Sequence, residues 1–142
     1  MSEKFSAAAK EAMTERFGHD TCISLVTVDG STPWVRTVNS YYENGAFYVV
    51  TYALSNKMRH IEKNPAVVIC GDWFSAHGTG ENLGYILDEK NAELAAKLRA
   101  AFASWYNNGD TNESDPNTCI LCIHLKNGIL HSGGKKYDID FT

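Results

Sequence analysis

An Asn-Gly pair, Asn44-Gly45, constrains this chain more than any other feature of its sequence. It separates two runs that are rich in β-branched and aromatic residues, 34–42 and 46–52. Asn and Gly both tolerate positive φ, which the short turn of a tight β-hairpin requires. The sequence therefore predicts an antiparallel hairpin here, within a fold built mainly from strands.

More strands are expected on both sides of this hairpin. Residues 21–28 are rich in β-branched side chains and are followed by the turn signal Asp29-Gly30. A second Asn-Gly pair, Asn127-Gly128, is predicted to turn a hairpin between 118–125 and 129–132. Residues 66–73, 74–87 and 136–141 complete the predicted strands.

Three segments show the apolar spacing and the end signals of helices, and they cover residues 3–17, 56–63 and 89–107. The first is amphipathic, and its apolar side chains recur at intervals of four. Asp88 is placed to cap the third, whose apolar stripe is expected to pack on the sheet.

Hairpin links between successive strands favour antiparallel pairing, and closure into a barrel hides the strand edges. We therefore predict a mainly β fold, a split β-barrel of about six to seven antiparallel strands with flanking helices. A chain of 142 residues suits one domain with one sizeable core, so a single domain is expected over residues 1–142.

Charge and hydropathy exclude several classes of partner. The formal net charge is −4 and no basic run is present, which argues against nucleic-acid binding. The longest aliphatic run, 66–70, is far too short to span a bilayer. The N-terminus lacks the apolar region of a signal peptide, so a cytoplasmic protein with reduced cysteines is expected.

The sequence offers no metal site. Cys119 and Cys122 form a C-x-x-C, but the surrounding residues have the pattern of a strand, in which positions three apart point to opposite faces. No second such pair completes a zinc site, and the five histidines lack metal-ligand spacing. Two buried strand cysteines are the preferred interpretation.

The stretch 51–65 carries the first candidate binding residues. Ser55 has the position of a helix N-cap, and the first turn that follows offers Asn56 and Lys57 instead of acidic residues. A cation opposes the helix dipole unless an anion arrives from outside, so free amides, a hydroxyl and an ammonium predict a phosphate site. The alternative is that Lys57 simply extends into water.

Arg36 adds a second cation. Strand alternation places it on one face with Trp34 and Val38, in the middle of a strand, where a solvated charge is unusual. A partly buried guanidinium needs a carboxylate or phosphate partner. Antiparallel pairing brings Arg36 towards the Thr51 end of the next strand, where it would converge with Lys57. The alternative is a partner among the chain's own Asp or Glu residues.

Four motifs, in this order, resemble those of the FMN-binding split-barrel family, the relatives of pyridoxamine 5′-phosphate oxidase. They are W-V-R-T-V, F-Y-V-V-T-Y, the S-N-K that opens the second helix and the N-P that closes it. The order of strands and helices also fits over nearly the full length. The resemblance implies a homodimer, with FMN in a groove between the two subunits.

The resemblance also implies roles for seven residues. The phosphate would be held by Arg36 and Lys57, with Ser55 and Asn56 as further donors, while Val38, Val50 and Thr51 would line the ribityl chain and the ring. Trp73, Trp105 and Tyr137 are candidates to flank the ring, although each is more typical of core or interface.

The C-terminal segment departs from pyridoxamine 5′-phosphate oxidase itself, because no arginine follows Arg99. Vitamin B6 oxidation is therefore not predicted, and the chain resembles the short members of the family, which include general-stress proteins. The expected function is an FMN-dependent oxidoreductase acting on an unidentified small molecule, without an assigned catalytic acid or base. The alternatives are a non-catalytic flavin-binding or redox-sensing protein, and the same fold with F420 or haem.

Overall fold

The computed structural model describes residues 5–109 and 111–142. Along the chain the elements are α1 (Ala7–Phe17), β1 (Thr21–Asp29), β2 (Thr32–Glu43), β3 (Ala46–Tyr52), α2 (Asn56–Lys63), β4 (Ala66–Gly71), β5 (Phe74–Tyr85), the 3₁₀ helix η1 (Glu89–Asn91), α3 (Ala92–Ala101), β6 (Thr118–Ser132) and β7 (Lys135–Asp140).

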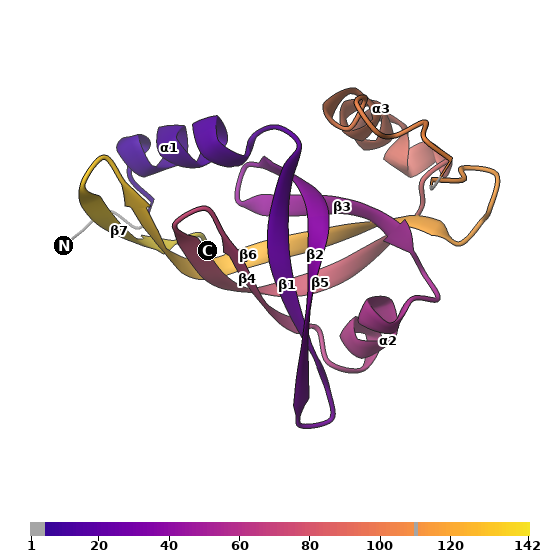
Figure 1. The fold of residues 1–142 in the computed structure, drawn as a ribbon, viewed down its shortest axis with the longest axis horizontal. Helices are drawn as coiled ribbons and strands as arrows, with labels where there is room; N and C mark the ends of the chain where they lie inside the picture. The colour runs from indigo at the N-terminus through magenta and orange to yellow at the C-terminus, as the bar shows by residue number, and fades with distance from the viewer. Residues whose placement is uncertain (1–4, 110) are drawn as a thin grey trace.

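The strands form one antiparallel sheet in the order β3-β2-β1-β4-β5-β6-β7, and an additional β3–β6 pairing closes it. The result is a closed six-stranded barrel, with β7 added to the far half of β6 (Figure 1). The prediction of a mainly β barrel with flanking helices is confirmed.

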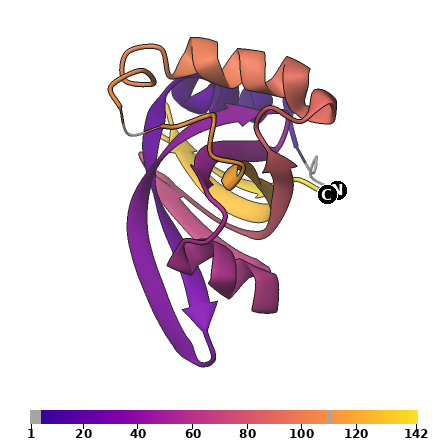
Figure 2. The same ribbon diagram turned by 90° about the vertical axis from the view of Figure 1, so that its right-hand side faces the viewer.

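The Asn-Gly turn between β2 and β3 has the expected geometry. Asn44 and Gly45 have φ values of +48° and +85°, and Glu43 pairs with Ala46 across the turn. The β1–β2 hairpin is longer and extends beyond the body of the barrel (Figures 1 and 2). Both hairpins thus follow from local turn chemistry.

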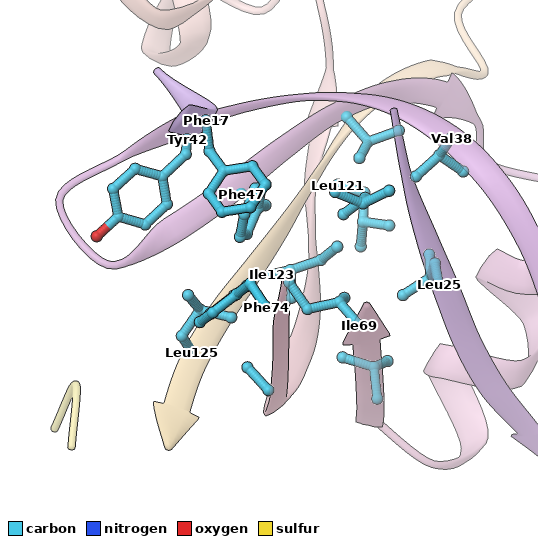
Figure 3. Packing of buried hydrophobic residues seen from close by; sticks show 14 of the residues in the cluster. Phe17, Leu25, Val38, Tyr42, Phe47, Ile69, Phe74, Leu121, Ile123 and Leu125 are labelled. Atoms are coloured by element: carbon cyan, nitrogen blue, oxygen red, sulfur yellow. The ribbon is translucent and has the colours of Figure 1, made fainter. Parts of the chain in front are cut away.

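The core fills the barrel and is closed at its ends by helices. Figure 3 shows Phe17 of α1 packed with Phe47 and Phe74 inside the barrel. Met58 and Ile61 of α2 join the same cluster. A second cluster lies beneath α3, where Leu98, Phe102, Ile86, Ile120 and their neighbours are buried. Burial of these aromatic and aliphatic side chains is the main source of stability.

The prediction of a hairpin at Asn127-Gly128 is wrong. β6 runs without a turn from Thr118 to Ser132, and Asn127 pairs with His77 of β5. Because Gly78 pairs with Leu125, Lys126 is an extra residue, and this marks a β-bulge. Gly128 instead allows β5 and β6 to approach each other closely, because a Cβ at this position would lie 2.8 Å from the Ala76 Cβ. The actual turn is Gly133-Gly134, where both φ values are positive.

Other boundaries also differ from the predictions. β4 ends at Gly71, because Asp72 and Trp73 form the turn into β5 with Trp73 at φ +53°. The third helix ends at Ala101, and bonds between residues three apart, such as Trp105 N–H to Phe102 C=O, continue it as turns. α1 begins at Ala7, capped by Ser6; the first two residues of the predicted helix lie outside the described residues.

Candidate functional site

The barrel is split between β2 and β3. These strands pair only near their turn, and the ladder ends at Tyr41 and Tyr48. Beyond that point β2 follows β1 while β3 follows β6. The facing edges of β2 and β3 therefore have no strand partner there, and their backbone groups are available to a ligand.

A groove of about 540 Å³ opens at this split, lined by Val38, Asn39, Val49, Val50, Thr51, Lys57, Trp105, Asn108 and Thr111. Four of the seven predicted residues, Val38, Val50, Thr51 and Lys57, are in this lining. Figure 2 shows that α2 and the segment after α3 lie on the same side of the barrel, where they flank β3.

The other three predicted residues adjoin the groove without lining it. Asn56 is exposed at the first position of α2. Ser55 is the N-cap residue, but its side chain makes no capping hydrogen bond; its Oγ lies 3.4 Å from Lys57 Nζ, from which it accepts. The hydroxyl thus orients the ammonium and leaves the first-turn amides uncapped by Ser55. The ligand contacts of these residues stay predictions.

Arg36 is the third of them, and it is half-buried. Its Nη1 donates to Thr27 Oγ1 at 2.7 Å and to the carbonyls of Leu25 and Trp34 at 3.2 and 3.3 Å. Among residues 5–109 and 111–142, no carboxylate pairs with Arg36, so an internal acidic partner is not found. Burial lowers the pKa of Arg36. The guanidinium is held in place by neutral oxygens, and no acidic group of the described residues compensates its charge.

Lys57, like Arg36, is a partly buried cation whose pKa is lowered. Burial lowers its pKa first, and the nearby charge of Arg36 lowers it further. In the part of the chain that the structure describes, no ion pair involves Lys57. The first turn of α2 contains no acidic residue. Two partly buried cations therefore lie near each other beside a helix N-terminus, an arrangement suited to a dianion.

Thr27 holds the Arg36 side chain in place by a hydrogen bond, and the sequence did not predict this role. Its side chain is fully buried, and its Oγ1 lies 2.7 Å from Nδ1 of His60 on α2. In the Nε2–H tautomer of His60, the Thr27 hydroxyl accepts from Arg36 and donates to His60 Nδ1, so it serves both partners. The signal in the sequence was a polar residue on the inward face of β1, two positions after the buried Leu25.

The far wall of the groove comes from the segment after α3. Trp105 stacks on Phe102 with ring centroids 4.9 Å apart, and its Nε1 donates to Asp20 Oδ2 at 2.8 Å. Asn39 of β2 donates to the other oxygen, Oδ1, at 3.1 Å. Asp20 therefore connects the wall of the groove to the strand on its opposite side. Neither Asp20 nor Asn39 was predicted.

Glu113 holds the same segment against α3. Arg99 donates to its carboxylate through Nε at 2.7 Å and through Nη2 at 3.2 Å, and the Tyr106 hydroxyl donates at 2.6 Å. These contacts, Arg99 first, hold the pKa of Glu113 below its usual value. Glu113 thus ties its part of the wall to α3 and to Tyr106.

The cysteines of the C-x-x-C are both buried and free, as predicted. Burial raises the pKa of each thiol to about 11, so neither is a ready thiolate. No group of His, Cys, Asp or Glu with the arrangement of a metal site occurs among the described residues. None of the helices in residues 5–109 and 111–142 has the length and hydropathy needed to cross a membrane.

The six strands form a barrel in which β2 and β3 separate beyond their turn. This places the protein among the split β-barrels. Residues 9–132 match the family described as pyridoxamine 5′-phosphate oxidase, so the chain belongs to that family. A search of curated proteins finds no match.

Solved structures with the same fold differ in what their names say they bind. General stress protein 26 from Bacillus anthracis is 20% identical over 92% of this chain and 98% of its own, with a TM-score of 0.68. A FAD-binding protein from Mesorhizobium loti is 14% identical over 87% and 91%, with a TM-score of 0.64. A haem-binding protein from Mycobacterium smegmatis is 15% identical over 96% and 59%, with a TM-score of 0.68. At these identities the likeness concerns the fold alone.

Proposed function

We propose that this protein binds FMN in the groove between β2 and β3 and acts as an FMN-dependent oxidoreductase on a small molecule. The observation that carries the proposal is the pair of partly buried cations, Arg36 and Lys57, that lack an acidic partner among the described residues. A phosphate of charge near −2 would compensate both.

The groove fits a flavin in size and chemistry. Its volume of about 540 Å³ lies within the usual range for small-molecule sites. From Lys57 the lining continues through Thr51, Val50 and Val38, which offer one hydroxyl and apolar surface to a ribityl chain and a ring. Trp105 adds an aromatic wall. Asn56 and Ser55 would add donors at the phosphate end.

FMN supplies the hydride chemistry when it is bound. The protein's residues would bind and orient the cofactor: Arg36 is pre-positioned by Thr27, Lys57 by Ser55, and Trp105 by Asp20. The wall held by Glu113 would exclude water from one side of the groove. No side chain is assigned as a catalytic acid or base.

A homodimer with the flavin at its interface is part of the proposal, and the outer face of the sheet supports it. Glu43 of β2 and Glu81 of β5 lie outward nearer the strand ends, whereas the outward positions in the central parts of four adjacent strands contain no Asp, Glu, Lys or Arg, although 21% of all residues are charged. They are Cys22, Ser24, Val26 and Val28 of β1; Val35, Thr37 and Asn39 of β2; Ala66, Val68 and Cys70 of β4; and Ser75, His77 and Thr79 of β5. We call this surface the uncharged face, and at Asn39 it reaches the groove.

The first test is the absorption spectrum of the purified protein, alone and with added FMN, because it separates flavin from F420 and haem directly. Lys57→Ala should weaken FMN binding about tenfold or more, since a charge-assisted contact is lost. Lys63→Ala, an exposed lysine in the last turn of α2, is the matched control and should bind normally. Equal affinity of the wild type and Lys57→Ala would place the phosphate elsewhere.

Two other functions would use the same fold. A flavin-binding or redox-sensing protein without turnover would bind FMN equally well, and steady-state assays with NADH or NADPH and an electron acceptor distinguish it from an enzyme. Haem is less consistent with the groove, because no His, Cys, Met or Tyr is among its described lining residues to act as an axial ligand.

A further inference from the structure

Asp20 organises two side chains that line the groove. It lies between α1 and β1 and uses one carboxylate oxygen for Asn39 Nδ2, at 3.1 Å, and the other for Trp105 Nε1, at 2.8 Å. These contacts join residues 19 and 85 positions away from Asp20. A carboxylate with two different donors fixes both donors in orientation as well as in place.

This contact determines which end of the Asn39 amide is available to a ligand. An ionised carboxylate can only accept hydrogen bonds, so the amide nitrogen must be the atom that faces Asp20. The same nitrogen lies 3.7 Å from Cys22 Sγ, which accepts its second hydrogen. In the described part of the chain, Asn39 Oδ1 has no hydrogen-bond donor. Asn39 therefore offers a carbonyl oxygen, not an N–H, to the groove that it lines.

Trp105 contributes no donor to the groove either. Its only N–H is used by Asp20, so the side chain presents aromatic carbon to a ligand. Between them, Asn39 and Trp105 form a surface with one acceptor and no donor. Such a surface favours a ligand that brings its own N–H.

We propose that Asn39 Oδ1 accepts the ring N–H of the bound cofactor and is a specificity-determining residue of the site. The inference rests on the proposed function. Asn39 lies three residues beyond Arg36 on β2, which corresponds to about 10 Å along the strand. The two side chains leave the strand on opposite faces, but Lys57 and Asn39 both line the groove, so a ligand that lies along it with its phosphate at Lys57 would bring its ring towards Asn39. The oxidised isoalloxazine ring carries a single N–H, at N3.

The chemical consequence is discrimination against rings that lack this hydrogen. A site that is built to hydrogen-bond an N–H leaves a desolvated acceptor unpaired when the N–H is absent, and this costs more than a missing apolar contact. Because Asp20 prevents the amide from rotating to offer its nitrogen, Asn39 cannot adapt to an acceptor on the ligand. Wild-type protein should therefore discriminate strongly at this position.

The test compares the binding of FMN and 3-methyl-FMN, in which a methyl group replaces the N3 hydrogen, by quenching of flavin fluorescence. Wild-type protein should bind 3-methyl-FMN about tenfold or more weakly than FMN. In Asn39→Ala the two flavins should bind within about twofold of each other, because the acceptor is gone and space for the methyl group is created. Asp20→Ala should reduce the preference for FMN, since the Asn39 amide is then free to rotate.

Thr37→Ala is the matched control, because Thr37 is the adjacent outward position of β2 and does not line the groove. It should keep the wild-type preference for FMN. Equal binding of FMN and 3-methyl-FMN to the wild type would overturn the inference and leave the proposed function standing. Failure of wild-type protein to bind either flavin would overturn both. The wild-type comparison needs no variant, so a folding defect in Asn39→Ala does not affect it.

Discussion

Lys57 illustrates how a single residue can point to a candidate binding site, because its charge is disfavoured in the ligand-free protein. It is a half-buried cation, it lies in the first turn of a helix, and a second cation is close to it. Each of these features opposes its positive charge, and both burial and Arg36 lower its pKa. A bound dianion would reverse all three effects.

The affinity for FMN should therefore depend on pH. With its pKa depressed below 10.5, Lys57 in the free protein loses its proton at a lower pH than an ordinary lysine. A bound phosphate favours the protonated form, so binding takes up a proton in that range and the Kd rises as the pH increases through it. Titrations from pH 7 to 10 would measure this.

Riboflavin, which has the same ring but no phosphate, is the control ligand and should not show the Lys57-dependent part of the change. Lys57→Arg should bind FMN with a flatter profile, because arginine keeps its charge. Identical pH profiles for FMN and riboflavin would contradict the assignment of Lys57 to the phosphate.

At the residue scale, the two cations could be predicted from the sequence but their supporting residues could not. Arg36 and Lys57 each break a local rule, as a charge in mid-strand and a cation at a helix start. Thr27, Asn39 and Asp20 break no such rule. Their roles come from contacts between different elements, and no periodicity in the chain signals those contacts.

At the scale of elements, β6 is the strand that pairs with three others. It pairs with β3 and β5 in its first half, and with β5 and β7 in its second. Gly128 lies in the second half, where Ala76 Cβ and the Ser75 carbonyl leave no space for a side chain. The glycine allows β5 and β6 to approach each other there.

Gly128→Ala should therefore lower the free energy of unfolding by about 1–3 kcal/mol, because the new methyl group must displace backbone. Chemical denaturation monitored by tryptophan fluorescence would measure the difference. Asn127→Ala is the matched control; its exposed side chain is hydrogen-bonded to His77 at 3.2 Å, and the loss of this bond should cost about 0.5 kcal/mol or less. Equal stabilities for the two variants would show that β5 and β6 separate easily.

Most elements were predictable, and Asn127-Gly128 shows where local reasoning fails. The pair has the same composition as Asn44-Gly45, which does turn the chain. What differs is the partner: residues 127 and 128 pair with His77 and Ala76 respectively, from a strand distant in the sequence. Long-range pairing overrides a local turn preference, and one sequence does not reveal which Asn-Gly pair has such a partner.

At the scale of the whole molecule, the uncharged face is the feature that the single chain does not use. Val26 and Val68 pair directly at its centre, on β1 and β4. The helices pack elsewhere, against the ends of the barrel and over the cluster beneath α3. A second copy of the chain would cover this face, as the proposed homodimer requires.

Val68→Glu should accordingly convert the proposed dimer to a monomer, because two carboxylates would be buried near each other across a two-fold interface. Light scattering coupled to gel filtration would measure the mass. Lys135→Glu, an exposed change at the β6–β7 turn, should leave the mass unchanged. A dimer that persists in Val68→Glu would exclude this face as the interface.

The β3–β6 pairing that closes the barrel also has a consequence for the order of folding. The β1–β2, β2–β3, β4–β5 and β6–β7 hairpins form from residues close in sequence, whereas Val50 must find Ile120. Such a contact carries a larger loop-closure entropy and is expected to form late. Because β3 borders the groove and the segment before β6 supplies its far wall, the binding site would be completed only as the barrel closes. A ligand that recognises the groove would then stabilise the finished barrel and none of its earlier hairpins.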